Sequence, residues 1–199
     1  MPKTGRLLGL AALFTLVLVG LVAHHAWSRW SGLEVRLAME PVDPRDLLLG
    51  HYVEIETIIH TLDLDSITGP EHEWRIGDSV WVRVRPEDGP ARAATEGARA
   101  NWSVSEVAHQ RPAPKAGAIW IHGRVARVVG SGSGGSASTS RLRARYNLER
   151  YYASSIEARR LEDLRQTRQL RLIVAVGPGG RAVIKGLEID GTTYYDTLL

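Results

Sequence analysis

The hydrophobic and polar positions of this chain follow two different patterns, and the change between them falls close to residue 30. Residues 7–23 (LLGLAALFTLVLVGLVA) contain no charged side chain, and the uncharged run continues to Trp27. About 20 apolar residues are enough for an α-helix to cross the hydrocarbon core of a bilayer. The pattern therefore predicts a membrane-spanning helix over residues 7–27.

Beyond this segment, apolar residues alternate with polar ones, which is the period of a half-buried β-strand. In the first such stretch, Leu33, Val35 and Leu37 alternate with Glu34 and Arg36. The same alternation, bounded by Gly, Pro and Asp residues, predicts further strands at 51–60, 80–85, 99–109, 117–129, 142–146, 170–176 and 181–191. Short connections favour antiparallel neighbours. We expect a mainly β fold, an antiparallel domain built as a curled sheet or barrel-like structure.

Two segments depart from the strand pattern. Residues 154–166 (SSIEARRLEDLRQ) begin with serines that can cap a helix, and their apolar residues share one side, so we expect one short helix near 155–166. Residues 130–140 (GSGSGGSASTS) contain only small side chains and are typical of a flexible loop. This loop lacks the Gly-Lys-Ser/Thr ending of a phosphate-binding loop.

Charge at the N-terminus predicts the orientation of the membrane helix. Lys3 and Arg6 precede it, and positive residues remain on the cytoplasmic side. We expect a cytoplasmic tail (1–6), a transmembrane anchor (7–27) and an extracytoplasmic, periplasmic β domain (28–199) in a single-pass protein of the cytoplasmic membrane. A cleaved signal peptide is the alternative, with a passable cleavage site at residues 26–28, but the apolar run is longer than such peptides usually have.

Composition excludes several classes of function. The chain has 199 residues, which suits one globular domain plus the anchor, and its net charge is only +3. Because the positive charge is small and not clustered on one segment, we expect no nucleic-acid partner. The absence of cysteine excludes disulfides, zinc thiolate sites and thiol catalysis.

Candidate chemistry lies around residues 41–57 (PVDPRDLLLGHYVEIET). The carboxylates of Asp43, Asp46, Glu54 and Glu56 have the type needed for general acid–base work, but turn formation explains the aspartates without catalysis. The histidines lack the close same-face spacing of a zinc motif, so we expect no metal and no other cofactor. These histidines are His51, His60, His109 and His122. Four tryptophans can stack a sugar or a base, although β proteins commonly place such rings in the core. They are Trp74, Trp81, Trp102 and Trp120.

The segment just quoted resembles the signature of the GDYXXLXY family of membrane-anchored bacterial proteins, in which a Gly-Asp-Tyr-x-x-Leu-x-Tyr run follows a Pro-x-Asp-Pro-Arg-Asp segment. Residues 75–89 (RIGDSVWVRVRPEDG), 143–153 (RARYNLERYYA) and 179–191 (GGRAVIKGLEIDG) resemble further elements of that family. In this chain, His51 replaces the aspartate of the signature and Thr57 replaces its last tyrosine.

The resemblance implies a set of motif residues and a kind of partner. The first motif comprises Asp43, Pro44, Arg45, Asp46, Gly50, His51, Tyr52 and Ile55. The second comprises Gly77, Asp78, Tyr146, Glu149, Arg150 and Tyr151. The molecular function of the family is uncharacterised, and its members often accompany or are fused to multi-spanning membrane proteins. We therefore expect binding to, or assembly with, a polytopic membrane protein, and no catalytic residue.

The alternative function is that of an envelope hydrolase. The anchor, the β domain and the segment around Met39 are similar to signal peptidases, but Ala38 stands where their nucleophilic serine would be. Without an attacking hydroxyl, that chemistry cannot proceed. A hydrolase would instead need a concave pocket that gathers several acid–base side chains. The candidates are Asp43, Asp46, Glu54, Glu56, His51 and His109.

Overall fold

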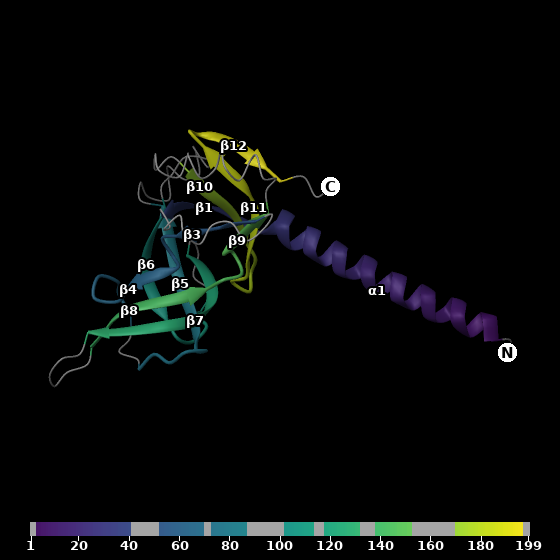
Figure 1. Cartoon of the computed structure of the whole chain (residues 1–199), viewed down its shortest axis with the longest axis horizontal. Coiled ribbons are helices and arrows are strands. Elements are labelled where there is room, and N and C mark those ends of the chain that lie inside the picture. The colour runs from purple at the N-terminus through teal and green to yellow at the C-terminus, as the bar shows by residue number, and fades with distance from the viewer. Residues whose placement is uncertain are drawn as a thin grey trace.

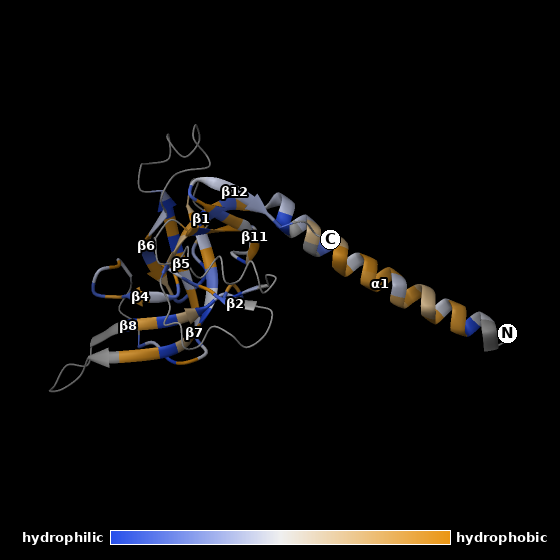
Figure 2. Ribbon diagram, turned by 45° about the horizontal axis from the view of Figure 1, so that its top comes forward, coloured by the Kyte–Doolittle hydropathy of each residue, from blue (hydrophilic) through white to orange (hydrophobic). Residues whose placement is uncertain are grey.

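The structure of the protein is a computed structural model that describes residues 3–40, 52–69, 73–86, 102–113, 118–131, 138–152 and 170–196. One long helix, α1 (Lys3–Ser31), projects from a β domain (Figure 1). Its apolar residues are exposed along its length, and the domain buries none of its most apolar stretch (Figure 2). The predicted helix over 7–27 is confirmed, and α1 is long and apolar enough to cross a membrane. It extends beyond the predicted segment at both ends.

The β domain consists of antiparallel sheets, as the alternating pattern predicts. The first sheet has the order β12 (Thr192–Tyr195), β11 (Ala182–Ile189), β10 (Leu170–Val176), β1 (Leu33–Glu40), β3 (Glu56–Thr57). The second has the order β4 (Thr61–Asp63), β8 (Ser138–Arg145), β7 (Ile119–Ser131), β5 (Ser79–Pro86), β6 (Trp102–Ala108). A two-stranded sheet joins β2 (Tyr52–Glu54) to β9 (Arg150–Tyr152). The second sheet curls around the core (Figure 1), so the predicted fold class is confirmed.

The structure corrects the predicted boundaries in two places. The strand predicted at 51–60 is wrong as a single element, because it breaks at Ile55 between β2 and β3 and ends in a turn at 58–60. The loop predicted over 130–140 is shorter, because Gly130 pairs with Thr139 and Ser131 with Ser138 at the ends of β7 and β8. The helix predicted near 155–166 lies outside the described residues. Within the described chain, α1 is the only helix.

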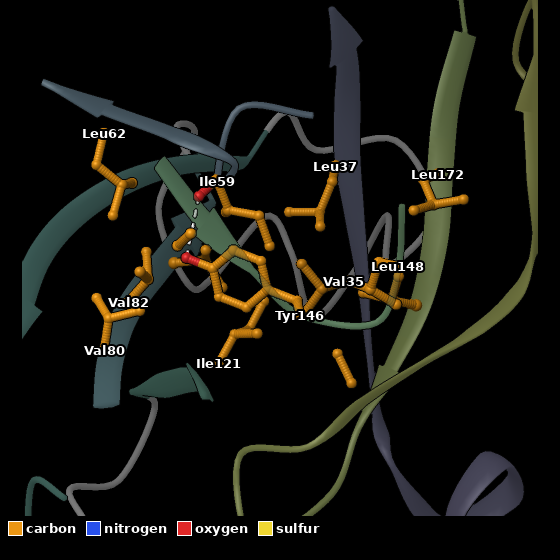
Figure 3. Close-up of a cluster of buried hydrophobic side chains, with 14 of the residues drawn as sticks. Val35, Leu37, Ile59, Leu62, Val80, Val82, Ile121, Tyr146, Leu148 and Leu172 are labelled. Atoms are coloured by element: carbon orange, nitrogen blue, oxygen red, sulfur yellow. Dashed lines mark hydrogen bonds between the residues drawn. The ribbon is translucent and has the colours of Figure 1, made fainter. Parts of the chain in front are cut away.

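The core lies between the two larger sheets (Figure 3). From the first sheet, Val35, Leu37 and Leu172 point into it, and all three are fully buried. From the second come fully buried side chains of Val80, Val82, Ile121 and Leu142. Strand β10 reads LRLIVAV and is almost entirely buried, which is the pattern of a central strand covered on both faces.

One glycine in β7 determines how closely a core ring packs. A Cβ atom at Gly123 would lie 2.5 Å from the ring of Tyr146 and 2.7 Å from the carbonyl oxygen of Arg145. Both distances are far below van der Waals contact, so a side chain at this position must displace β8 or the ring. Gly123 therefore allows Tyr146 to lie flat against the second sheet.

We expect the Gly123→Ala substitution to lower the free energy of unfolding by about 1–3 kcal/mol, the range for overpacking a core. Gly179→Ala is the matched control, because a Cβ atom there meets nothing within 4 Å. Thermal unfolding of the full-length protein in detergent, followed by circular dichroism, measures both. Equal stability of the two variants would contradict the tight packing at Gly123.

Candidate functional site

Two motif segments that are far apart in the sequence meet in the small sheet. Tyr52, Val53 and Glu54 of β2 pair with Tyr152, Tyr151 and Arg150 of β9, respectively. The Ile55 N–H donates to the carbonyl oxygen of Glu149 at 2.8 Å, and the Ile55 side chain is buried. The strand break at Ile55 therefore places the first motif directly against the Tyr-x-x-Glu-Arg-Tyr element.

Tyr146 of this element is a core residue. Its hydroxyl donates to the carbonyl oxygen of Ile59 at 3.0 Å (Figure 3), and its ring meets that of His60 edge to face. Burial, and then the negative charge of Glu149, raises the pKa of Tyr146 far above its usual range. The phenol thus stays protonated and holds the turn after β3 against β8.

Beside this ring, Thr57, His60 and Glu149 form a hydroxyl–imidazole–carboxylate series. His60 Nδ1 accepts from the Thr57 backbone N–H at 2.9 Å and lies 3.0 Å from the Thr57 hydroxyl. His60 Nε2 lies 3.7 Å from Glu149 Oε1. The order is that of a nucleophile, its base and an orienting acid. However, Thr57 is 0% exposed and His60 is 2% exposed, so no substrate can reach the hydroxyl. The contacts of these three residues instead stabilise the turn between β3 and β4.

Glu149 is the charged centre of that arrangement. Burial raises its pKa, but the nearby His60 side chain and backbone N–H donors, including that of Tyr146 at 2.6 Å, outweigh burial and lower the pKa to about 2. The ionised carboxylate therefore accepts hydrogen bonds from its own loop and fixes the loop between β8 and β9. Sequence reasoning identified Glu149 through the motif but missed His60 as its neighbour, because 89 residues separate them.

The Gly77–Asp78 motif forms a turn, as its sequence suggests. Gly77 has φ 94°, a backbone conformation that favours glycine. Its N–H donates to the carbonyl oxygen of Val125, and the Val125 N–H donates to the carbonyl oxygen of Asp78. The Asp78 carboxylate accepts from the Arg75 N–H at 2.9 Å. The hydrogen bonds of Gly77 and Asp78 therefore attach the start of β5 to β7.

Of the carboxylates considered for acid–base chemistry, Glu54 and Glu56 lie within the described residues, and both are on strands. Glu56 Oε1 lies 3.3 Å from Arg143 and accepts from the Thr61 hydroxyl. Its strand neighbour is Glu40, which the sequence did not single out. Burial and then the charge of Glu56 raise the pKa of Glu40. Among the described residues, no three His, Asp or Glu side chains lie close enough together to hold a metal ion.

A second cluster of charges lies where α1 meets the first sheet. The Arg29 guanidinium donates to the carbonyl oxygens of Lys185 at 2.9 Å and Asp196 at 2.7 Å. The Asp196 carboxylate accepts from the hydroxyl of Tyr151, which is a motif residue on β9. Because a planar guanidinium with two acceptors has a fixed orientation, these bonds clamp the end of α1 to β11 and the chain after β12. We call this the Arg29 clamp.

The first sheet, to which the Arg29 clamp binds, contains buried ion pairs. Arg36 is 3% exposed and pairs with Glu188, which is 1% exposed and also binds Arg171. Glu34 accepts from Lys185 at 3.1 Å and from Arg36 at 3.1 Å. Burial raises the pKa of Glu34, but these two donors and Tyr195 lower it overall. Removing one partner of such a pair would leave a buried charge without compensation.

A groove lies on another side of the same junction, and we call it the juxtamembrane groove. Its volume is about 510 Å³. It is lined by Trp27, Ser31, Leu33, Trp81, Arg111, Pro112, Ala118, Ile119, Trp120, Val176, Gly177, Pro178 and Gly180. The lining thus comes from the end of α1, the start of β1, the connection from β6 to β7, and the turn between β10 and β11.

The turn between β10 and β11 forms one fixed wall of the juxtamembrane groove. Gly180 has φ 76°, and a Cβ atom there would lie 2.5 Å from the Trp81 ring. The Gly180 carbonyl oxygen accepts from the His122 N–H at 2.8 Å, and the Pro178 carbonyl oxygen accepts from the Arg111 guanidinium at 3.2 Å. Hydrogen bonds therefore hold this wall against β7 and Arg111.

Aromatic rings and one cation give the juxtamembrane groove its chemistry. Trp81 stacks on His122, with ring centroids 4.5 Å apart, and the Arg111 guanidinium lies 5.9 Å from the Trp81 ring. Burial, and then Arg124, lowers the pKa of His122. Arg111 is the only ionisable side chain among the described lining residues. The indole N–H of Trp120 is buried and has no hydrogen-bond partner in the described part of the chain.

A family model described as GDYXXLXY protein matches residues 14–187. The match begins inside α1 and ends in β11, so it covers most of the chain. The chain belongs to the GDYXXLXY protein family. No curated protein and no solved structure matches it.

For this GDYXXLXY protein, part of the predicted site lies outside the described residues. That part comprises Asp43, Pro44, Arg45, Asp46, Gly50 and His51, whose roles stay predictions. The structure brings Tyr52 and Ile55 to the second motif but not to the juxtamembrane groove. Sequence reasoning missed the groove. The signal that could have found it was the pair Trp27 and Ser31, one helical turn apart at the end of the apolar helix.

Because the pKa of Glu149 is low, its contribution to the free energy of unfolding should depend on pH. Above its ordinary pKa of 4.5, Glu149 is ionised in both folded and unfolded chains, and its full stabilising contribution is present. Between pH 4.5 and about 2, the unfolded chain takes up the proton first, so the contribution is lost. We expect Glu149→Gln to lower the free energy of unfolding by an amount on the order of 1–3 kcal/mol at pH 7, and by progressively less toward pH 2.

Unfolding of the full-length protein in detergent at several pH values measures this difference. Glu73→Gln is the control, because the Glu73 side chain is 83% exposed and pairs only with the exposed Arg75 in the described structure. We expect no pH-dependent difference for that variant. A Glu149→Gln difference that is as large at pH 3 as at pH 7 would show that Glu149 does not act through its charge.

Proposed function

We propose that this protein is a single-pass protein of the bacterial cytoplasmic membrane, with its N-terminus in the cytoplasm and its β domain on the periplasmic side. There it binds to, or assembles with, a multi-spanning membrane protein. In this proposal residues 1–6 form the cytoplasmic tail, residues 7–27 the anchor and residues 28–199 the external domain. The apolar length of α1 and the positive charges of Lys3 and Arg6 support the orientation.

The observation that carries the binding role is the rigid junction between helix and domain. Gly32 is the only residue between the end of α1 and the start of β1, and the Arg29 clamp joins the same helical turn to β11. A tethered enzyme that searches for substrates is served by a flexible linker. A domain fixed to its membrane helix instead presents its surface at one height and one angle, which suits docking to a partner in the same membrane.

Cysteine labelling tests the proposed topology, since the native chain contains no cysteine. We expect a membrane-impermeant maleimide to label Ser66→Cys, an exposed position in the β domain, in intact spheroplasts. Thr4→Cys should be labelled only after the membrane is permeabilised. Labelling of Thr4→Cys but not of Ser66→Cys in intact spheroplasts would show that the topology is the reverse of the one proposed. Release of the protein from membranes by salt alone would show that α1 is not a membrane anchor.

Photo-crosslinking tests the partner. We expect crosslinkers at Leu16, exposed on α1, and at Tyr194, exposed on β12, to capture the same multi-spanning protein. Arg29→Gln should reduce the Tyr194 crosslink several-fold and leave the Leu16 crosslink unchanged, because it frees the domain but not the helix. Arg75→Gln, which removes an exposed ion pair, is the control. If neither site captures a membrane protein, the partner proposal fails.

An envelope hydrolase is the second candidate, and one observation favours it. Glu40 and Glu56 are register neighbours, and the pKa of Glu40 is raised, as in paired carboxylates that share acid–base work. Against it, Ala38 lies inside β1 and supplies no nucleophile. Of the six acid–base candidates, the described Glu54, Glu56 and His109 do not line the juxtamembrane groove. The hydrolase hypothesis requires that the purified full-length protein degrade envelope polymers and that Glu40→Gln abolish the reaction.

A further inference from the structure

We propose that the juxtamembrane groove binds an anionic phospholipid of the outer leaflet, with the phosphodiester at Arg111 and the upper acyl chain against the tryptophan rings. The inference rests on the proposed topology, which places the β domain outside the membrane. It adds a lipid ligand to a protein whose proposed partner is another membrane protein.

The level of the juxtamembrane groove relative to the bilayer supports a lipid as its ligand. Trp27 follows Leu7 by 20 residues, which is about 30 Å of helix, the thickness of the hydrocarbon core. Trp27 therefore lies at the outer edge of the core, and Ser31 lies one turn further out, about 6 Å higher, among the headgroups. Exposed aromatic and apolar side chains surround the same level, as in the aromatic belts of membrane proteins. They are Trp27, Trp30, Leu33, Tyr194 and Tyr195.

The juxtamembrane groove is continuous with the lipid-facing surface of α1. Trp27 and Ser31 are four residues apart, so they lie on one face of the helix, and both line the groove. Trp27 is 72% exposed, so it lies at the open end of the groove and not in its floor. A lipid lying beside the helix can therefore place its headgroup in the groove and keep its acyl chains in the bilayer.

The lining has the chemistry of an anionic amphiphile. Leu33, Ile119 and Val176 offer apolar contacts, and the volume falls within the roughly 300–1,000 Å³ that is usual for small-molecule sites. Arg111 supplies the positive charge, and a guanidinium binds phosphate oxygens in a forked geometry. The single hydrogen bond found for it within the described part of the chain, to Pro178 at 3.2 Å, leaves other N–H groups for a phosphate.

The same lining discriminates between lipids and against peptides. The described lining residues include no Asp or Glu, so the ammonium of a zwitterionic headgroup would find no carboxylate there. A peptide segment would need partners for each of its backbone N–H and C=O groups, and an apolar lining with one cationic side chain supplies few. An anionic phospholipid needs only the phosphate contact and the apolar wall.

Tryptophan quenching by brominated lipids tests the proposal with the full-length protein in nanodiscs. We expect phosphatidylglycerol brominated near the start of its acyl chains to quench the fluorescence at lower lipid fractions than brominated phosphatidylcholine. The preference should be about tenfold, because both lipids offer a phosphodiester but only phosphatidylcholine also brings an ammonium near the Arg111 guanidinium, where like charges repel. Arg111→Gln should abolish the preference. Arg181→Gln is the matched control, because Arg181 is exposed beside the same turn but does not line the juxtamembrane groove.

Two kinds of quenching result would overturn the lipid site. One is equal quenching by the two lipids in the native protein, and the other is a preference that persists in Arg111→Gln or disappears equally in Arg181→Gln. A photo-crosslinker at Pro112 distinguishes the occupant directly: transfer to a phospholipid supports the proposal, and transfer to a protein overturns it. The maleimide labelling does not depend on Arg111, so it shows separately whether the proposed topology has failed.

Discussion

Gly32 is the only residue between the end of α1 and the first strand of the β domain, and the architecture depends on this short connection. A Cβ atom at Gly32 would lie 2.9 Å from the Cβ of Ala175, so only glycine lets the end of α1 lie this close to β10. With no linker to absorb a change of angle, the direction of α1 is set by the first sheet. The Arg29 clamp then fixes the rotation of the helix by binding two carbonyl oxygens at the far side of that sheet.

Three motif residues of the described chain contribute to this constraint. Tyr151 connects β9 to Asp196, whose carbonyl oxygen Arg29 binds, so a motif residue takes part in holding α1. Tyr146 and Glu149 hold the turn and loop that position β9 itself. Their burial and hydrogen bonds indicate a structural scaffold, with a hydroxyl–imidazole–carboxylate series closed to substrate. The juxtamembrane groove, by contrast, is open beside the end of α1.

Much of the fold was predictable because it depends on local patterns. The uncharged run before Trp27 gave the helix, and period-two alternation gave the strands of β1, β5, β7 and the hairpin of β10 with β11. The strand break at Ile55 was not predictable, because alternation continues through it and the break is made by a hydrogen bond to Glu149, 94 residues away. The short β4 and β9 escaped for the same reason, since pairing with distant strands defines them. The short β12 was also missed, although it forms a hairpin with the adjacent β11.

Hydropathy, strand period and turn residues act between neighbours in the chain, so the long apolar helix, the mainly β class and the motif residues could be found from local patterns. Which residues meet depends on the folded chain. It paired His60 with Glu149, Arg36 with Glu188 and Arg29 with the chain end after β12, and it placed Trp81, Arg111 and Trp120 beside the end of α1. Such contacts join segments tens to more than a hundred residues apart, so they follow from sheet order and register, which no local pattern contains.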